Sequence, residues 1–101
     1  MVASMEIRID PHTLQRAQER GANAGEIRDV ILNGVTQPAR EGRLRRVQVY
    51  RYERDRLGRF YPHKRVEVIY VIEAEVAVTV TVYVFYGEWE SADADPVRQQ
   101  D

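Results

Sequence analysis

Three side chains near the N-terminus have the types and the spacing that acid–base chemistry on a phosphate requires. His12, Arg16 and Arg20 recur every four residues in a predicted helix, so they share one helix face. Histidine titrates near neutral pH and can accept or give a proton, and arginine binds phosphate with a fork of N–H groups. A structural interpretation stays open: His12 caps the helix or bonds a sheet edge, and the arginines pair with Glu19 or Asp29.

A second group of candidates lies in a strongly basic block over residues 40–65. The block holds ten basic residues and three acidic ones, although the whole chain has a net charge of −1. Arg45, Arg46, Lys64 and Arg65 are the candidates for RNA binding through phosphate. A solvated hairpin with charges on both faces is the alternative.

Cleavage of RNA without a metal needs a base for the 2′-hydroxyl, cations for the charged phosphorane and an acid for the leaving oxygen. His12, Arg16, Arg20 and Tyr83 are the candidate catalytic residues. Tyr83 could stack a base or donate the proton, whereas His63 follows Pro62 in a predicted loop and is expected to be surface. Tyr50, Tyr52, Tyr83 and Phe85 could form an RNA-stacking surface or a contact with a protein partner.

Composition excludes several other chemistries. The 101 residues suit one domain, and the absence of cysteine removes disulfides, thiolate nucleophiles and cysteine-ligated metals. Two histidines cannot fill a zinc shell alone, so we expect no metal and no cofactor. The longest apolar stretch, 76–86, is shorter than the ~20 residues of a spanning helix, so we expect a cytoplasmic protein without a membrane contact.

The first secondary-structure elements that we expect along the chain are a short strand at Glu6–Ile9 and two helices, which would position these residues. Asp10 and Pro11 are typical of a helix start, and Gly21 of its end. A second helix begins after Asn23, with Glu26 in the acid position of a capping box. It carries the apolar stripe Ile27, Val30 and Ile31 and ends at Asn33-Gly34. The first four residues could be a leader with Met5 as the natural start.

The rest of the chain reads as strands. We expect a weak edge piece at 35–41, a strand over 44–53, a turn at 55–58, a strand over 64–73 delayed by Pro62, and a final strand over 76–86. In the final strand the alternate residues Val76, Val78, Val80, Val82 and Val84 predict one unbroken face toward the helices.

These elements predict an α+β fold in two layers. An N-terminal strand precedes a two-helix hairpin, which packs on one face of a three- to five-stranded antiparallel sheet. The domain would span 5–89, with Trp89 over the sheet end, and residues 90–101 would form a disordered acidic tail.

A family resemblance adds to this interpretation. The stretch from His12 to Gly21 resembles the "H-A-x-x-R-x-x-x-R-G" opening of the DUF4258 family, and residues 26–31, 66–72 and 81–83 resemble its second helix and its ending. That family is similar to the RelE/ParE-like toxin superfamily. The resemblance implies a RelE-like fold and a toxin of a toxin–antitoxin system, with metal-independent cleavage of messenger RNA at the ribosome or poisoning of gyrase, and with an antitoxin partner.

The sequence departs from that pattern because its last strand holds no cation and an acidic segment follows it. A non-catalytic protein-binding or homodimerisation module on the same scaffold therefore stays open, as does an RNA binder without catalysis.

Overall fold

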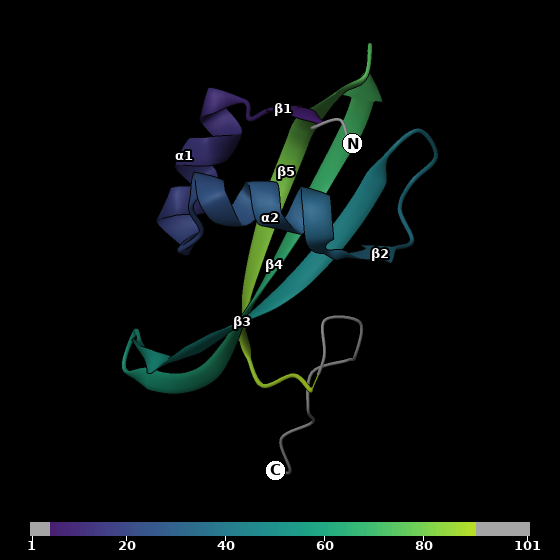
Figure 1. Ribbon diagram of the computed structural model, residues 1–101. Helices are drawn as coiled ribbons and strands as arrows, with labels where there is room; N and C mark the ends of the chain where they lie inside the picture. Colours follow the sequence, from purple (N-terminus) through teal and green to yellow (C-terminus); the bar gives the residue numbers. More distant parts are fainter. Residues whose placement is uncertain (1–4, 91–101) are drawn as a thin grey trace.

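Two helices lie across one face of a five-stranded sheet in the computed structural model, which describes residues 5–90 (Figure 1). The strand order is β1-β5-β4-β3-β2. The α+β, two-layer fold predicted from the sequence is confirmed. The elements are β1 (Glu6–Arg8), α1 (Pro11–Arg20), α2 (Ala24–Asn33), β2 (Val35–Gln37), β3 (Leu44–Arg56), β4 (Arg59–Glu73) and β5 (Val76–Gly87).

Local capping sets both helix starts and the end of α1. The Asp10 carboxylate accepts a hydrogen bond from the Thr13 amide at 3.1 Å, and Pro11 occupies the first turn. Gly21 ends α1 with a left-handed φ of 102°. In α2 the Asn23–Glu26 capping box makes both of its bonds. These predictions from single residues are confirmed.

Gly34 ends α2 for a reason that the sequence pattern does not reveal. Its φ is −73°, so it does not form the left-handed cap that the Asn-Gly pair predicts. A Cβ at this position would lie 2.5 Å from the Val30 carbonyl oxygen and 2.8 Å from that of Val47. Glycine is therefore required because the end of α2 approaches the backbone of β3 closely.

One strand pairing corrects the predicted antiparallel sheet. β1 pairs in parallel with β5, with Glu6 opposite Val76 and Arg8 opposite Val78, while the other three pairings are antiparallel. Three residues cannot encode a strand direction by themselves. The direction follows from α1, which continues from β1 and is tied to β5 by the bond from the Asp10 amide to Thr79 Oγ1.

The predicted valine face of β5 is confirmed for Val82 and Val84 but is wrong for the first part of the strand, because the strand contains a bulge. Ile69 pairs with Thr81 and Tyr70 with Thr79, which leaves Val80 without a partner. An extra residue reverses the side-chain alternation of a strand. Ala77 and Thr79 therefore face the helices before the bulge and Val82 faces them after it, and all three are buried.

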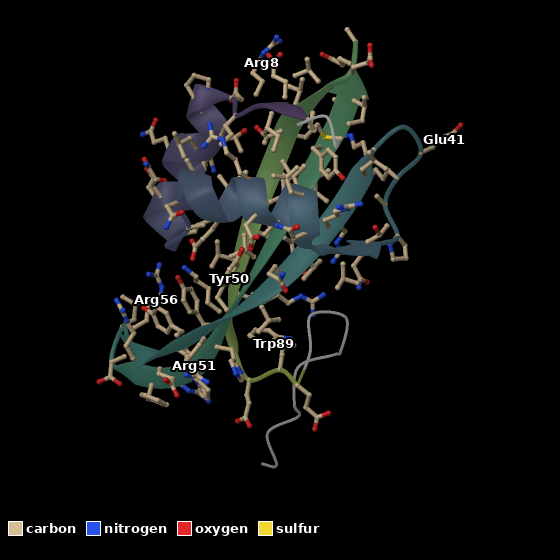
Figure 2. The ribbon with its side chains drawn as sticks, in the orientation of Figure 1. Arg8, Glu41, Tyr50, Arg51, Arg56 and Trp89 are labelled. Atoms are coloured by element: carbon tan, nitrogen blue, oxygen red, sulfur yellow. The ribbon has the colours of Figure 1, made fainter. Side chains whose placement is uncertain are left out.

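A second bulge allows β4 to begin earlier than predicted. β3 and β4 shift register between Arg51 and Arg54, opposite Pro62, so the proline lies inside the strand where the ladder is interrupted. Beyond this point the two strands continue as a curved ribbon that carries Arg51 and Arg56 (Figure 2). Pro62 does not delay the strand, and the hairpin is longer than the sequence indicated.

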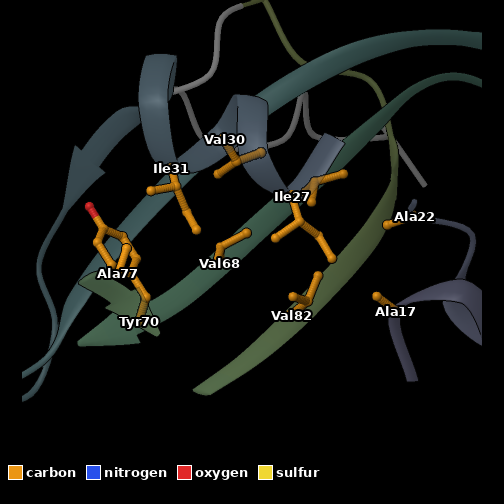
Figure 3. Close-up of a cluster of buried hydrophobic side chains, with 10 residues drawn as sticks. Ala17, Ala22, Ile27, Val30, Ile31, Val68, Tyr70, Ala77 and Val82 are labelled. Atoms are coloured by element: carbon orange, nitrogen blue, oxygen red, sulfur yellow. The ribbon is translucent and has the colours of Figure 1, made fainter. Parts of the chain in front are cut away.

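The hydrophobic core lies between α2 and the centre of the sheet (Figure 3). Ile27, Val30 and Ile31 form the buried stripe of α2, as predicted. They pack against Val66 and Val68 of β4, which are fully buried. Burial of each such side chain stabilises the fold by about 1.5–3 kcal/mol before entropy is counted. The two helices thereby cover the centre of this face of the sheet.

Trp89 packs over the end of the sheet, as predicted, and is only 4% exposed. Its ring lies against Gly87, and its amide donates to His63 Nδ1 at 3.2 Å. The expected leader at 1–4 and all but the first residue of the expected disordered tail lie outside the described residues.

Candidate functional site

The sheet face opposite the helices, here called the open face, contains a hollow. It has a volume of about 820 Å³. Its lining comes from the segment between β2 and β3 and from strands β3, β4 and β5. The lining residues are Pro38, Ala39, Arg40, Arg43, Arg45, Glu67, Ile69, Thr81, Tyr83 and Phe85. We call this feature the arginine hollow.

Glu67 lines the arginine hollow and is almost fully buried. Arg45 binds its Oε1 with two nitrogens, Nε at 3.1 Å and Nη2 at 2.7 Å. Arg65 Nε lies 3.2 Å from its Oε2. A buried carboxylate is stable only with such partners. The two guanidinium groups fix the Glu67 side chain, and Arg45 remains one-third exposed toward the hollow.

Two aromatic rings beside the arginines are accessible to a ligand. Tyr83 and Phe85 are 44% and 46% exposed, and their ring centroids lie 6.3 Å apart at an angle of 29°. They project from β5 on the open face because they follow the Val80 bulge. Exposed planar rings of this kind are suitable for stacking of unpaired bases.

Three of the predicted catalytic residues come together along the edge of β5. His12, Arg16 and Arg20 line a smaller hollow of about 190 Å³ with residues 80–82. Arg20 Nη1 donates to the Val82 carbonyl at 2.7 Å, and its guanidinium lies 5.9 Å from the Tyr83 ring centroid. Tyr83, which lines the arginine hollow, thus lies beside Arg20 of the smaller hollow, and Thr81 lines both.

The four predicted RNA-binding residues are divided between the two sheet faces. Arg45 and Arg65 lie on the open face with Glu67. Arg46 instead donates to the carbonyls of Ile31 and Leu32 at the end of α2. The division follows from strand alternation, since neighbouring residues point to opposite faces.

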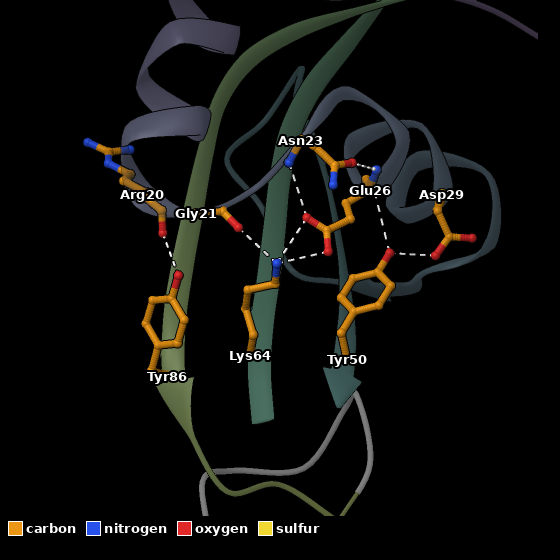
Figure 4. Close-up of polar contacts among 8 residues, drawn as sticks. All are labelled: Arg20, Gly21, Asn23, Glu26, Asp29, Tyr50, Lys64 and Tyr86. Atoms are coloured by element: carbon orange, nitrogen blue, oxygen red, sulfur yellow. Dashed lines mark hydrogen bonds and ion pairs between the residues drawn. The ribbon is translucent and has the colours of Figure 1, made fainter. Parts of the chain in front are cut away.

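Lys64 also lies on the helix side, in a polar network at the junction of the helices (Figure 4). Its ammonium group donates to the Gly21 carbonyl at 2.8 Å and contacts both Glu26 carboxylate oxygens, at 3.0 and 2.8 Å. Lys64 therefore joins the end of α1 and the start of α2 to β4.

Two tyrosines complete this network and are not available as an RNA surface. The Tyr50 hydroxyl donates to Asp29, and that of Tyr86 donates to the Arg20 carbonyl at 2.6 Å (Figure 4). Burial, followed by the bond to Asp29, raises the pKa of Tyr50. The same bond lowers the pKa of Asp29, and burial raises the pKa of Tyr86. Of the four aromatics predicted to share a surface, only Tyr83 and Phe85 stack together.

Sequence reasoning missed Glu67, Arg40 and Arg43 as site residues. A charged residue between the apolar residues Val66 and Val68 of a central strand was the available signal for Glu67. The position of Arg40 and Arg43 depends on the path of the segment between β2 and β3, which no local pattern indicates.

Within residues 5–90, no group of three acidic, histidine or cysteine side chains is arranged to hold a metal.

Comparisons with known proteins give no neighbour: no family model, no curated protein and no solved structure matches the chain. None of the helices in the described part is long and apolar enough to cross a membrane.

Proposed function

We propose that the protein binds single-stranded RNA in the arginine hollow and cleaves it without a metal ion, as a toxin-like ribonuclease on a RelE-like scaffold. One observation carries this proposal: a buried carboxylate held between two guanidinium groups opens onto a hollow that also presents two exposed stacked rings. Arginine favours phosphate and the rings favour unpaired bases, so the lining matches the two parts of an RNA strand.

The residues present can supply each step of the cleavage. Glu67 accepts the proton of a ribose 2′-hydroxyl, whose oxygen attacks the adjacent phosphorus. Arg45 and Arg43 stabilise the added negative charge on the phosphorane. The bond from phosphorus to the 5′-oxygen breaks, and the Tyr83 hydroxyl gives that oxygen a proton. The products are a 2′,3′-cyclic phosphate and a free 5′-hydroxyl.

The test uses a 5′-labelled single-stranded RNA with the purified protein and EDTA. We expect cleavage to a cyclic phosphate, and we expect Glu67→Gln to lower the rate by about 100-fold or more, as loss of a general base does. Glu75→Gln is the matched control, because Glu75 is exposed in the β4–β5 turn. An intact RNA with the wild-type protein, or equal rates for E67Q and wild type, contradicts the catalytic proposal.

RNA binding is tested separately, with the exposed arginines of the hollow. We expect Arg40→Ala/Arg43→Ala to weaken binding at least tenfold and to reduce its salt dependence, since each phosphate contact contributes to the salt slope. Arg8→Ala/Arg28→Ala removes the same charge from exposed positions elsewhere and serves as the control. Equal affinity of the two double variants contradicts an RNA site in the hollow.

A protein partner is the second candidate, favoured by the exposure of Tyr83 and Phe85. An antitoxin-like chain or a second copy of this chain could cover the open face. Light scattering of Tyr83→Ser/Phe85→Ser against wild type tests the homodimer: a wild-type dimer that the variant converts to monomer supports it, and a wild-type monomer contradicts it.

A further inference from the structure

The outer part of the β3–β4 hairpin, residues 51–63, forms an arm that leaves the sheet. The last pairing of β4 with β5 joins His63 to Gly87, so the ribbon beyond it has no neighbouring strand (Figure 1). The arm is nevertheless held in place. Tyr52 and Tyr61 pack on the ring of Tyr86, with centroid distances of 5.1 and 5.6 Å. It is therefore a fixed projection and not a loose loop.

The tip of the arm combines backbone strain with exposed apolar surface. Arg56 pairs with Arg59, and the two residues between them, Leu57 and Gly58, have φ values of 53° and 83°. A turn of this type favours asparagine or aspartate before glycine, and a leucine at positive φ is strained. Leu57 is also 96% exposed, and Phe60 beside it is 56% exposed. Turn geometry and burial do not account for these two side chains, so the strain and the exposed apolar area together mark the tip as a candidate contact surface.

The charge around the tip favours a polyanion as that ligand. The arm carries four arginines, at 51, 54, 56 and 59, against the two acids Glu53 and Asp55. The Arg56 guanidinium lies 4.6 Å from the Tyr86 ring centroid, which orders it next to the end of α1. Arginine with intervening aromatic rings is the composition of surfaces that follow a nucleic-acid strand.

The arm begins on the open face and then turns toward the helix side of the sheet, where Arg56 Nη2 donates to the Glu19 carbonyl at 3.5 Å. Arg45 and Arg51 lie six positions apart on β3, ahead of the bulge, so both point to the open face. Eight residues of β4 separate Glu67 from Arg59, roughly 26 Å at the rise of a strand. A strand of about 4–16 nucleotides, the usual site size of single-strand-binding folds, can span such a path.

We propose that the arm is a second contact for the same RNA, in which its arginines hold phosphates and Leu57 and Phe60 pack against bases beyond the hollow. This inference rests on the proposed function. It adds that the substrate is a strand long enough to reach from Glu67 to the arm tip. The affinity should therefore rise with RNA length until the strand reaches the tip.

The experiment measures fluorescence anisotropy with labelled single-stranded RNAs of graded length, from about 3 to about 16 nucleotides, the latter the upper site size of such folds. The variant is Leu57→Asn/Phe60→Thr. Asparagine suits the positive φ at the tip, so the variant should fold at least as well as wild type. We expect it to bind the shortest RNAs like wild type and to bind the longest at least tenfold more weakly.

Ala74→Asn is the matched control. Ala74 has a φ of 51° in the exposed turn between β4 and β5, at the opposite end of the sheet. This substitution relieves the same kind of strain without removing an apolar tip, so its RNA affinity should equal that of wild type at every length.

The outcomes separate the two proposals. Equal affinities of wild type and L57N/F60T for the longest RNA overturn the arm contact, and so does a variant that changes only the oligomeric state in light scattering. Binding of short RNAs without any rise with length overturns the arm contact and leaves the hollow. A wild-type protein that binds no RNA of any length overturns the proposed function and this inference with it.

Discussion

Replacement of Lys64 by methionine tests whether this cation is a structural part of the helix–sheet junction or an RNA contact. Methionine keeps an unbranched apolar stem and removes the ammonium group. In the structure that group makes a 2.8 Å bond to the Gly21 carbonyl and a 2.8 Å contact with Glu26 Oε2. The side chains of Lys64 and Glu26 are only 10% and 19% exposed, so water replaces the lost partner poorly.

The loss of stability follows from these contacts. A hydrogen bond to a charged group contributes about 1.5–3 kcal/mol, and breaking a buried ion pair costs about 3–5 kcal/mol. Glu26 keeps its bond to the Asn23 amide and some access to water. We therefore expect the free energy of unfolding to fall by the lower figure, about 3 kcal/mol, which corresponds to a Tm lower by about 12–24 °C for a domain of this size.

The assay is thermal and urea unfolding followed by circular dichroism, with Arg28→Met as the control. Arg28 is exposed on α2, so its substitution should change the free energy of unfolding by less than about 0.5 kcal/mol. At a temperature where Lys64→Met is folded, its RNA affinity should equal that of wild type. A Tm within a few degrees of wild type would refute the structural role of Lys64, and a loss of RNA affinity by folded K64M would refute our placement of the RNA site.

Three further predictions concern stability. Gly34→Ala should lower the free energy of unfolding by about 2 kcal/mol or more, because its Cβ meets the Val30 and Val47 carbonyls, and urea titration measures this. Since the pKa of Tyr50 is raised in the fold, its contribution to the free energy of unfolding should be fully present below the ordinary tyrosine pKa of about 10 and should fall as the pH rises above that value. Tyr50→Phe should flatten this decline in unfolding curves taken from pH 8 to 12. Since the pKa of Asp29 is lowered, its contribution should be present above its ordinary pKa of about 3.9 and disappear as the pH falls through the folded value, and Asp29→Asn should remove that part of the acid dependence; an unchanged acid curve would contradict it.

Local chemistry let the sequence predict the helices and part of the core. The Asp10 and Asn23 caps act within a few residues of the chain, so their bonds can be read before the fold is known. The stripe of α2 and the alternation around Val66 and Val68 of β4 likewise depend only on the periods of helix and strand. The same alternation places Arg45 and Arg46 on opposite faces, although the sequence analysis grouped both as RNA-binding residues.

Tertiary structure alone decided the features that depend on residues far apart in the chain. The Val80 bulge exists because β4 and β5 shift register, and it turns Tyr83 and Phe85 onto the open face. The parallel direction of β1 depends on the path of α1 beside β5.

The arginine hollow also needs contacts that no local pattern encodes. Glu67 meets Arg45 across 22 residues of sequence, and the segment between β2 and β3 brings Arg40 and Arg43 to the same place. Side-chain type and spacing thus determined which residues could carry phosphate chemistry. Strand register and chain path decided which of them lie together.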